Sequence, residues 1–206
     1  MERFPAAGGR IPLDLRVPLR NPDYAPFLQR VRDAAPEALF IFVPSGEGAA
    51  LTKQFAERGL GQAGIKLIGT GDVVDDDILN DMGEAVIGAI TSHHYSAAHD
   101  SPENRAFRAA YAEVAPNARP NFMAVGGFDG IRALGEALRH TAGSDDGERL
   151  LAAMKGLAWT SPRGPVSIDP DTRDMVQDIY IRRTERRDGQ IWNIEFDRIP
   201  RVRDGS

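Results

Sequence analysis

The 206-residue chain contains no cysteine, which excludes disulfide bonds, thiol catalysis and zinc sites built on thiolates. It has no apolar run of about 18 residues, the length that a membrane-spanning helix needs. Its net charge is -5, so no general excess of basic residues points to nucleic acid. Hydrophobic residues make up 42% and charged residues 27%, as in globular proteins with a core of their own. We expect neither a nucleic-acid partner nor direct membrane insertion.

Two short stretches invite a nucleotide or calcium site but lack the spacing that such sites need. Gly69-Thr70-Gly71-Asp72 has neither the three spaced glycines of a dinucleotide fingerprint nor the Gly-Lys-Ser/Thr of a Walker A loop. Asp75-Asp76-Asp77 lacks the alternating ligands and the closing glutamate of a calcium loop. We interpret it as the acidic first turn of a helix, where the helix dipole favours carboxylates. No cofactor is predicted.

Three of the four histidines, His93, His94 and His99, lie within seven residues of one another. Such a group invites a metal site, but the segment reads as a strand end followed by a loop. It lacks the His-Glu-x-x-His spacing that places two ligands on one helix face. We therefore predict loop histidines and no metal.

The clearest local pattern lies in residues 38–60. A short apolar run rich in β-formers, Leu39 to Val43, is followed by the turn residues Pro44-Ser45-Gly46 and then by a helical pattern that stops at Gly59. A second apolar run, Ile65 to Ile68, follows and predicts a parallel strand of a βαβ unit. Ligands of open α/β sheets collect where such strands end, which points to residues 44–47 and 70–72.

The remaining patterns extend this alternation and then change character. Alternating apolar residues predict a strand over Leu13–Leu19, Asn21-Pro22-Asp23 is expected to cap the next helix, and Glu84–Thr91 reads as a further strand. Helical patterns then begin at Ser101-Pro102, Asn121 and Asp145-Asp146. Two last strands, 176–182 and 190–196, are joined at Asp188-Gly189, a strong hairpin signal. The order predicts an α/β fold with two lobes and crossovers near residues 91–96 and 158–166.

Nine segments spread over residues 12–200 carry a resemblance through their order and spacing. They are PDxxxFLxxV, APEALFIF, KQFAERGL, KLIGTG, GAITSHHY, NRAFRAAY, GGFDGIRALGEAL, LLAAMKGL and SPRGPVSIDPDTRD. In this order the chain resembles the C-terminal half of the periplasmic substrate-binding proteins of ABC transporters, in the branched-chain amino-acid (Leu/Ile/Val-binding) family. GGFDG stands where the family usually has Tyr-Asp-Ala or Tyr-Asp-Gly.

The resemblance implies a type I periplasmic-binding-protein-like α/β fold, with two lobes joined by hinge crossovers and the first lobe largely missing. It implies that residues 1–90 form part of the second lobe as β-α-β-α-β, and that residues 91–96 form a hinge crossover. Residues 97–157 are then a helical return into the first lobe, and 158–206 return to the second lobe with a β-hairpin. The implied protein is periplasmic, with a signal peptide expected in a full-length form.

The implied function is that of the solute-binding component of an ABC importer, with permease subunits as partners and no enzymatic activity. The solute is a small molecule: an amino acid, an aromatic or other carboxylic acid, or an amide. The solute-binding residues implied by the resemblance are Pro44, Ser45, Gly46, Glu47, Gly71, Asp72, Tyr95 and Phe128.

Several of these residues have a simpler alternative role. Ser45 caps a helix, Asp72 makes a turn and Phe128 belongs to the core in this alternative. Amino-acid binders of the family hold the α-ammonium with an acidic residue, whereas Gly71 occupies the best-aligned position here and Asp72 stands beside it. A carboxylic acid or amide is therefore at least as well supported as an amino acid.

Two other classes of protein remain as alternatives. The first is a serine-type hydrolase, for which Ser45, His94 and Asp72 supply the residue types of a Ser–His–Asp triad. Val43–Glu47, however, is not a Gly-x-Ser-x-Gly elbow. A cytoplasmic ligand sensor on the same fold would need a DNA-binding or signalling module, for which the sequence shows no pattern.

Overall fold

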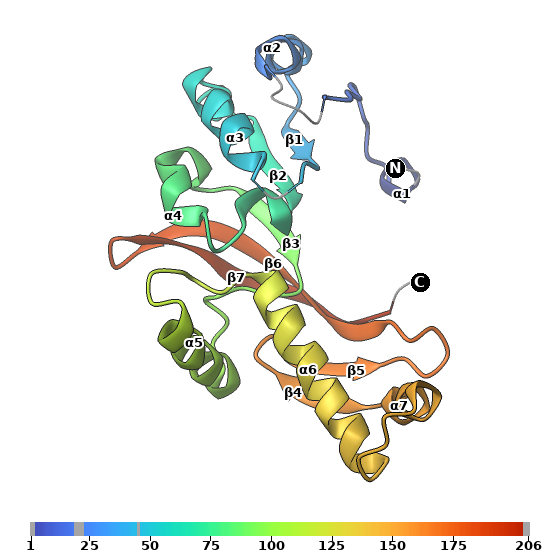
Figure 1. Ribbon diagram of the computed structural model, residues 1–206. Coiled ribbons are helices and arrows are strands. Elements are labelled where there is room, and N and C mark those ends of the chain that lie inside the picture. Colours follow the sequence, from blue (N-terminus) through green and yellow to red (C-terminus); the bar gives the residue numbers. More distant parts are fainter. Residues whose placement is uncertain (1–2, 19–22, 45, 204–206) are drawn as a thin grey trace.

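The computed structural model describes residues 3–18, 23–44 and 46–203 (Figure 1). Its helices are α1 (Arg3–Ala6), α2 (Ala25–Ala34), α3 (Gly48–Glu57), α4 (Leu79–Met82), α5 (Pro102–Val114), α6 (Phe122–His140) and α7 (Gly147–Met154), with the 3-10 turns η1 (Gly71–Val74) and η2 (Gly83–Val86). Its strands are β1 (Ala38–Ile41), β2 (Lys66–Thr70), β3 (Ile90–His93), β4 (Ala158–Ser161), β5 (Gly164–Ile168), β6 (Met175–Arg187) and β7 (Gln190–Val202).

The strands form one sheet in the order β1-β2-β3-β6-β5-β4, with β7 paired to β6. β1 and β2 are parallel, with Leu39 opposite Leu67, and α3 lies between them in the chain. This confirms the predicted βαβ unit. β3 continues the parallel set beside β2, so three successive strands end at the same edge of the sheet.

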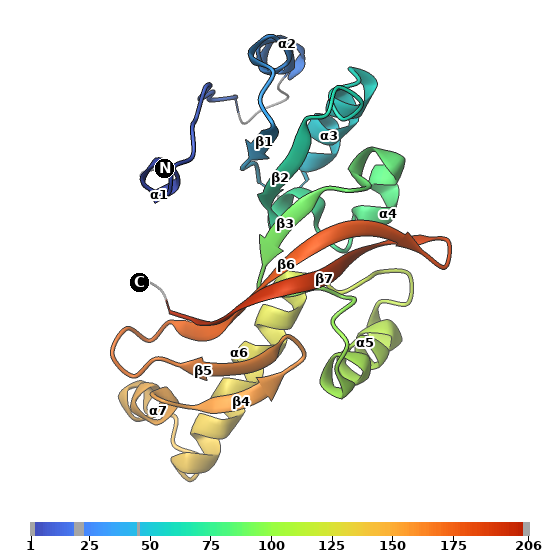
Figure 2. The same cartoon turned by 180° about the vertical axis from the view of Figure 1, so that it is seen from behind.

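The hairpin of β6 and β7 connects the two parts of the molecule (Figures 1 and 2). One stretch of β6 pairs with β5 over residues 175–177, and another pairs with β3 over residues 180–183. Asp188 and Gly189 both have positive φ, as the predicted two-residue turn requires. On one side lie β1–β3 with α2–α4, and on the other β4 and β5 with α5–α7. The division into lobes at 90, 96 and 157 remains a prediction.

Three helices in the second half begin at side-chain caps. The hydroxyl of Ser101 accepts from the backbone N–H of Asn104, and the carboxylate of Asp146 accepts from Glu148 and Arg149. Asn121 caps α6 in the same way. Each cap satisfies backbone donors that a helix start leaves free, which is why these starts were readable from local sequence.

Two predicted strands are wrong. Residues 11–18 form no strand: Leu13, Leu15 and Val17 do turn towards the core, but prolines stand at 12 and 18 and a strand needs a bonded neighbour. The predicted strand 84–91 is instead the turn η2 followed by β3, because Gly83 and Gly88 adopt positive φ and break the extended backbone. Leu19, Asn21 and Pro22 lie outside the described residues.

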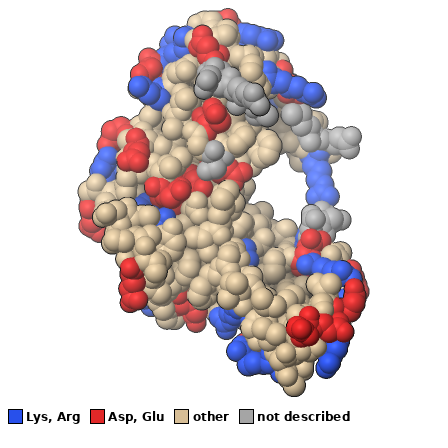
Figure 3. Space-filling view, viewed as in Figure 1, with Lys and Arg blue, Asp and Glu red and all other residues tan. Residues whose placement is uncertain are grey.

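A main hydrophobic core packs α2, α3 and the 3-10 turns on the sheet, and a second one gathers Tyr95, Ala97, Phe107 and Val125. The outer face of α6 is apolar and exposed at Met123, Phe128, Ile131 and Leu134. Figure 3 shows a broad uncharged area over the middle of this face of the molecule. None of the described helices combines the length and apolar character needed to cross a bilayer.

Candidate functional site

The candidate site lies where β1, β2 and β3 end. Because these strands are parallel neighbours, the segments after Ile41, Thr70 and His93 leave the sheet at one edge. Polar residues that follow parallel strands therefore converge there, as in other open α/β sheets. The sequence-based choice of residues 44–47 and 70–72 relied on this rule.

The segment after β1 makes a turn into α3. The backbone N–H of Glu47 donates to the carbonyl of Pro44 at 3.1 Å, and Gly46 has a φ of +93°, which suits glycine. Pro44 is exposed, Glu47 is half-buried with its carboxylate 3.4 Å from the hydroxyl of Tyr24, and Ser45 lies outside the described residues. Whether these residues contact a solute remains a prediction.

Gly71 sits at the closest approach between the segment after β2 and the end of β3. A Cβ at this position would lie 2.0 Å from Cδ2 of His93 and 2.5 Å from Nη2 of Arg182. Any side chain here would displace both groups. The present packing of His93 and Arg182 therefore depends on glycine at this position.

Aromatic rings from β3 and α6 meet beside Gly71. The rings of His93 and His94 stack with centroids 4.4 Å apart. The ring of Phe122 meets both in an edge-on arrangement, with its centroid 4.8 Å from that of His93 and 5.9 Å from that of His94. Nε2 of His93 lies 3.4 Å from Oδ1 of Asp72. We call Thr70, Asp72, His93, His94 and Phe122 the strand-end cluster.

Hydrogen bonding within the cluster is incomplete. Nδ1 of His93 and Oγ1 of Thr70 are buried and have no protein partner. Burial lowers the pKa of His93 although Asp72 opposes it, while the contact with His93 lowers the pKa of Asp72. We therefore assign a neutral imidazole with its proton on Nε2, facing an ionised Asp72. Nδ1 is then an acceptor that lacks a donor, and such buried groups are rare because they cost free energy.

The neutral state of His94 leads to a testable pH dependence. Burial is the main cause that lowers the pKa of His94 from 6.5 to about 3. A proton then binds the unfolded chain more tightly than the folded one, so stability falls as the pH drops below 6.5. Between pH 7 and pH 5 we expect His94 to remove about 2 kcal/mol from the free energy of unfolding. Urea unfolding at several pH values measures the loss, and His94→Gln should make it smaller by this amount. An equally steep loss in that variant would contradict the assignment.

Tyr95 and Phe128 are placed differently from the strand-end cluster. Tyr95 is fully buried, donates its hydroxyl to Asn104 at 3.1 Å and packs against Phe107. Phe128 is 43% exposed on α6, and its ring lies 5.0 Å from that of Phe107. Contact of either residue with a solute stays a prediction. Phe122, the first residue of α6, is the aromatic residue of this helix that contacts His93 and His94.

A buried arginine lies directly beneath the site. Arg182 on β6 donates from Nη1 to the carbonyl of Tyr95 at 2.6 Å, and from Nε and Nη2 to the hydroxyl of Thr91 at 3.3 and 3.2 Å. Its Nη2 also lies 3.5 Å from the carbonyl of Gly71. One side chain thus ties together the segments that follow β2 and β3.

The counter-charge of Arg182 is Asp76, at 3.7 Å. Burial raises the pKa of Asp76 and lowers that of Arg182, and their mutual attraction opposes both shifts. Asp76 also accepts from the N–H of Ala97 and from the amide of Asn193, so we treat the pair as ionised.

This placement corrects the interpretation of the Asp75-Asp76-Asp77 stretch as the first turn of a helix. Asp75 and Asp76 are buried, Asp75 accepts from Asn121, and α4 begins only at Leu79. Their role is to accept hydrogen bonds from segments distant in the sequence. Within residues 3–18, 23–44 and 46–203, no group of three or more histidine and acidic side chains is placed to hold a metal ion.

Sequence reasoning missed several of these residues. His93 and His94 were read as loop histidines, and nothing singled out Phe122 or Arg182, whereas the strand-end rule did point to Thr70. Asp129, in the Phe-Asp-Gly segment, is buried and accepts from Trp159, Ser161 and Arg163 at 3.0, 2.9 and 2.8 Å, so it fixes α6 to β4 and to the turn after it. A charged residue within an apolar helix pattern was the available signal.

Comparison with known proteins decides the family. The model of the family described as periplasmic binding protein matches residues 2–190. The chain belongs to the periplasmic binding protein family. It is 37% identical over 196 residues to the Leu/Ile/Val-binding protein homolog 6 of Brucella abortus, covering 94% of this chain and 50% of that protein. The chain thus spans about half the length of the curated relatives that it matches.

Solved structures of periplasmic binding proteins agree with the fold. A solute-binding protein of an ABC transporter from Rhodopseudomonas palustris BisB5, in complex with 3,4-dihydroxybenzoic acid, is 58% identical with a TM-score of 0.93, covering 99% of this chain and 56% of that one. One from strain HaA2, in complex with p-hydroxybenzoic acid, is 36% identical with a TM-score of 0.93 and the same coverage. The predicted type I periplasmic-binding fold and the resemblance are thereby confirmed. The family consists of solute-binding proteins rather than enzymes.

Proposed function

We propose that this chain is part of the solute-binding component of an ABC importer and that its solute is a hydroxylated aromatic carboxylic acid. The observation that carries the proposal is the buried Nδ1 of His93, which lacks a donor and belongs to a ring that contacts those of His94 and Phe122. A phenolic hydroxyl supplies the missing donor, and the aromatic rings offer a surface for the solute ring. The two R. palustris proteins were crystallised with solutes of this chemistry.

The carboxylate of the solute requires donors at the same edge of the sheet. The hydroxyl of Thr70 has no protein partner, and the first backbone N–H groups of α3 follow the turn at 44–47. Free N–H groups at a helix start favour negative charge. We propose that the turn of Pro44, Ser45, Gly46 and Glu47 contacts the carboxylate through these backbone N–H groups, and that Gly71 and Asp72 lie beside the solute ring.

An amino acid is less well supported as the solute. Its α-ammonium needs a carboxylate, and the aligned position is Gly71, where the structure has no room for a side chain. Asp72 is the neighbouring candidate, but its carboxylate already faces His93. In the proposed site for an aromatic acid, Phe128 forms a wall of the cleft and Tyr95 supports the site from behind.

The proposed mechanism is non-covalent capture in the periplasm. Segments from both parts of the molecule surround the solute, and the closed form becomes populated because the solute binds it more tightly. The permease subunits of the importer are the proposed partners of that form. The hinge is proposed at residues 91–96, next to the Arg182 contacts.

A thermal-shift series tests the class of solute. A ligand that binds only the folded chain raises the unfolding midpoint as its concentration rises. We expect 3,4-dihydroxybenzoate to raise it more than benzoate, and leucine to leave it unchanged. A rise with leucine alone would contradict the proposal and restore an amino-acid binder.

Phe122→Ala should weaken binding of 3,4-dihydroxybenzoate by about 1–3 kcal/mol, because the aromatic contact is lost. This corresponds to about a fivefold to 150-fold rise in the dissociation constant. Isothermal titration calorimetry measures it, with Met123→Ala as the matched control, since Met123 is the next residue of α6 and is 62% exposed. Equal affinities for the two variants would remove Phe122 from the site.

A further inference from the structure

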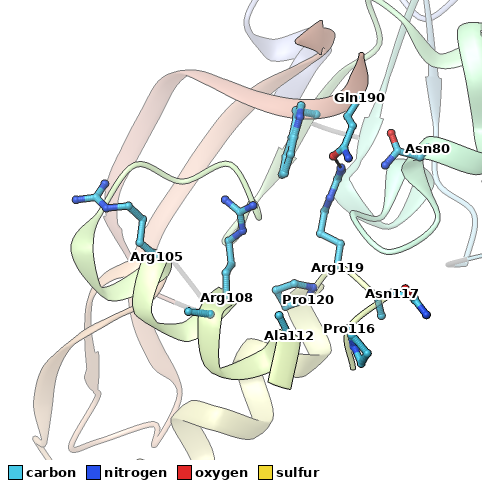
Figure 4. Close-up of a pocket in the computed structure, with 12 residues that line it drawn as sticks. Asn80, Arg105, Arg108, Ala112, Pro116, Asn117, Arg119, Pro120 and Gln190 are labelled. Atoms are coloured by element: carbon cyan, nitrogen blue, oxygen red, sulfur yellow. Dashed lines mark hydrogen bonds between the residues drawn. The ribbon is translucent and has the colours of Figure 1, made fainter. Parts of the chain in front are cut away.

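A cavity lies away from the strand-end cluster and shares no residue with it. It has a volume of about 490 Å³ and is bounded by α5, the segment after α5, Asn80 of α4 and the start of β7 (Figure 4). This volume falls within the usual range of small-molecule sites. The cavity belongs to neither the proposed hinge nor the proposed solute site.

The described lining of this cavity is basic although the whole chain is acidic. Its twelve residues include Arg105, Arg108 and Arg119 and no aspartate or glutamate. The chain as a whole has 30 acidic and 25 basic residues, so an acid-free lining with three arginines is a marked local excess of positive charge. Figure 4 shows Arg108 and Arg119 reaching towards the hairpin residue Gln190, whereas Arg105 points outward.

Arg108 and Arg119 are held by a tryptophan rather than by carboxylates. Their guanidinium carbons lie 4.9 and 3.6 Å from the ring centroid of Trp192. Arg119 donates to two neutral acceptors, the carbonyl of Ile191 and the side-chain oxygen of Gln190. The structure records no ion pair for Arg108 among the described residues. Burial and the charge of Arg108 lower the pKa of Arg119, against the attraction of Asp76.

The amide side chains of the cavity present donors. Oδ1 of Asn80 accepts from the backbone N–H of Ile191 at 2.8 Å, and Oε1 of Gln190 accepts from Arg119 at 3.0 Å. Because both oxygens are used by protein donors, the NH₂ groups of these two amides remain for a ligand. The cavity thus combines two guanidinium groups without carboxylates and two amide donors.

We propose that this cavity binds a small oxyanion with two or more negative charges, either a polycarboxylate or a phosphate. Arg108 is the principal ligand, Arg119 supplies a second positive charge, and Asn80 and Gln190 complete the donor set. Planar guanidinium groups bind carboxylate and phosphate oxygens in pairs, which favours this class of ligand. Because α5 and the β6–β7 hairpin both line the cavity, a bound anion contacts both elements and stabilises their packing.

Fluorescence of Trp192 tests the proposal. The chain has two tryptophans, so Trp159→Phe leaves Trp192 as the single reporter inside the cavity. Citrate and inorganic phosphate are titrated at constant ionic strength, with chloride as the compensating anion. We expect a saturable change in emission with at least one probe, and the preferred probe identifies the anion class. A change that does not saturate, or that chloride reproduces, would overturn the site.

Substitutions separate this site from a general charge effect. Arg108→Gln should raise the dissociation constant of the preferred probe at least about tenfold, since a charge-assisted pair is lost. Arg149→Gln removes one exposed arginine of α7 and should leave it unchanged. Arg108→Lys keeps the positive charge but lacks the planar guanidinium group, so its effect should be intermediate. This variant keeps the proposal testable if Arg108→Gln does not fold. Equal binding by all three variants would overturn the proposal.

Phe122→Ala serves as the control for the solute site. It should weaken dihydroxybenzoate binding and leave citrate or phosphate binding unchanged. The two proposals can therefore fail independently.

Discussion

Arg182→Met is expected to lower the free energy of unfolding by about 3–5 kcal/mol, because it leaves the carboxylate of Asp76 buried without its counter-charge. The side chains of both residues are only 2% exposed, so solvent cannot replace the lost partner. The substitution also removes the donors to Thr91 and to the carbonyls of Tyr95 and Gly71. Urea unfolding followed by circular dichroism measures the loss.

Arg183→Met provides the matched control on the next residue of β6. Arg183 is exposed. Its 4.0 Å ion pair with Glu185 and its contact with the half-exposed ring of Phe196, 4.7 Å from the centroid, both lie at the surface, so we expect a change within about 0.5 kcal/mol. Asp76→Asn in the Arg182→Met background should recover part of the loss, since the buried charge is then removed. A loss for Arg182→Met no larger than that of the control would contradict the proposed role of Arg182.

Gly71→Ala is expected to abolish solute binding and to lower the free energy of unfolding by about 1–3 kcal/mol, as overpacking does in a filled interior. The added methyl group would lie 2.0 Å from His93 and 2.5 Å from Arg182, so both must move. The movement displaces the acceptor nitrogen of His93 from its place beside Phe122. Calorimetric titration with 3,4-dihydroxybenzoate and urea unfolding measure the two effects.

Gly126→Ala is the control for this substitution. Gly126 lies within α6, and a Cβ there would meet nothing within 4 Å. Because alanine restricts the unfolded chain and favours helix, we expect unchanged binding and a gain of about 0.4–1 kcal/mol. Binding by the Gly71→Ala chain as tight as that by Gly126→Ala would show that the close contact with His93 does not matter.

Local sequence signals predicted much of the fold. The β1–α3–β2 unit, the caps at Ser101 and Asp146 and the Asp188-Gly189 hairpin each depend on neighbouring residues, and each is present in the structure. The strand predicted over 13–19 failed because alternation reports which side chains turn inward, but a strand also needs a hydrogen-bonded neighbour. Such a neighbour is not encoded in the segment itself.

The chemistry of the site could be predicted only in part. The strand-end rule identified Gly71 and Asp72, because parallel strands end together whatever their sequences. The neutral state of His93 depends on burial and on Arg182, whose partners Tyr95 and Gly71 lie 87 and 111 residues away in the chain. Phe122 approaches His93 only because Asn121 caps α6 and bonds to Asp75. Contacts between residues so far apart in the chain form only when the fold brings the segments together, and no local sequence pattern indicates them.

The most direct test of the account follows the imidazole nitrogens of the chain by ¹⁵N NMR during titration with 3,4-dihydroxybenzoate. Before addition, Nδ1 of His93 should give the signal of an unprotonated nitrogen without a hydrogen-bond donor. We predict a saturable shift of this signal as the phenolic hydroxyl binds, with no shift at His140, which is exposed at the end of α6. A His93 signal that stays fixed while the solute binds, or that moves no more than that of His140, would contradict the proposed role of His93.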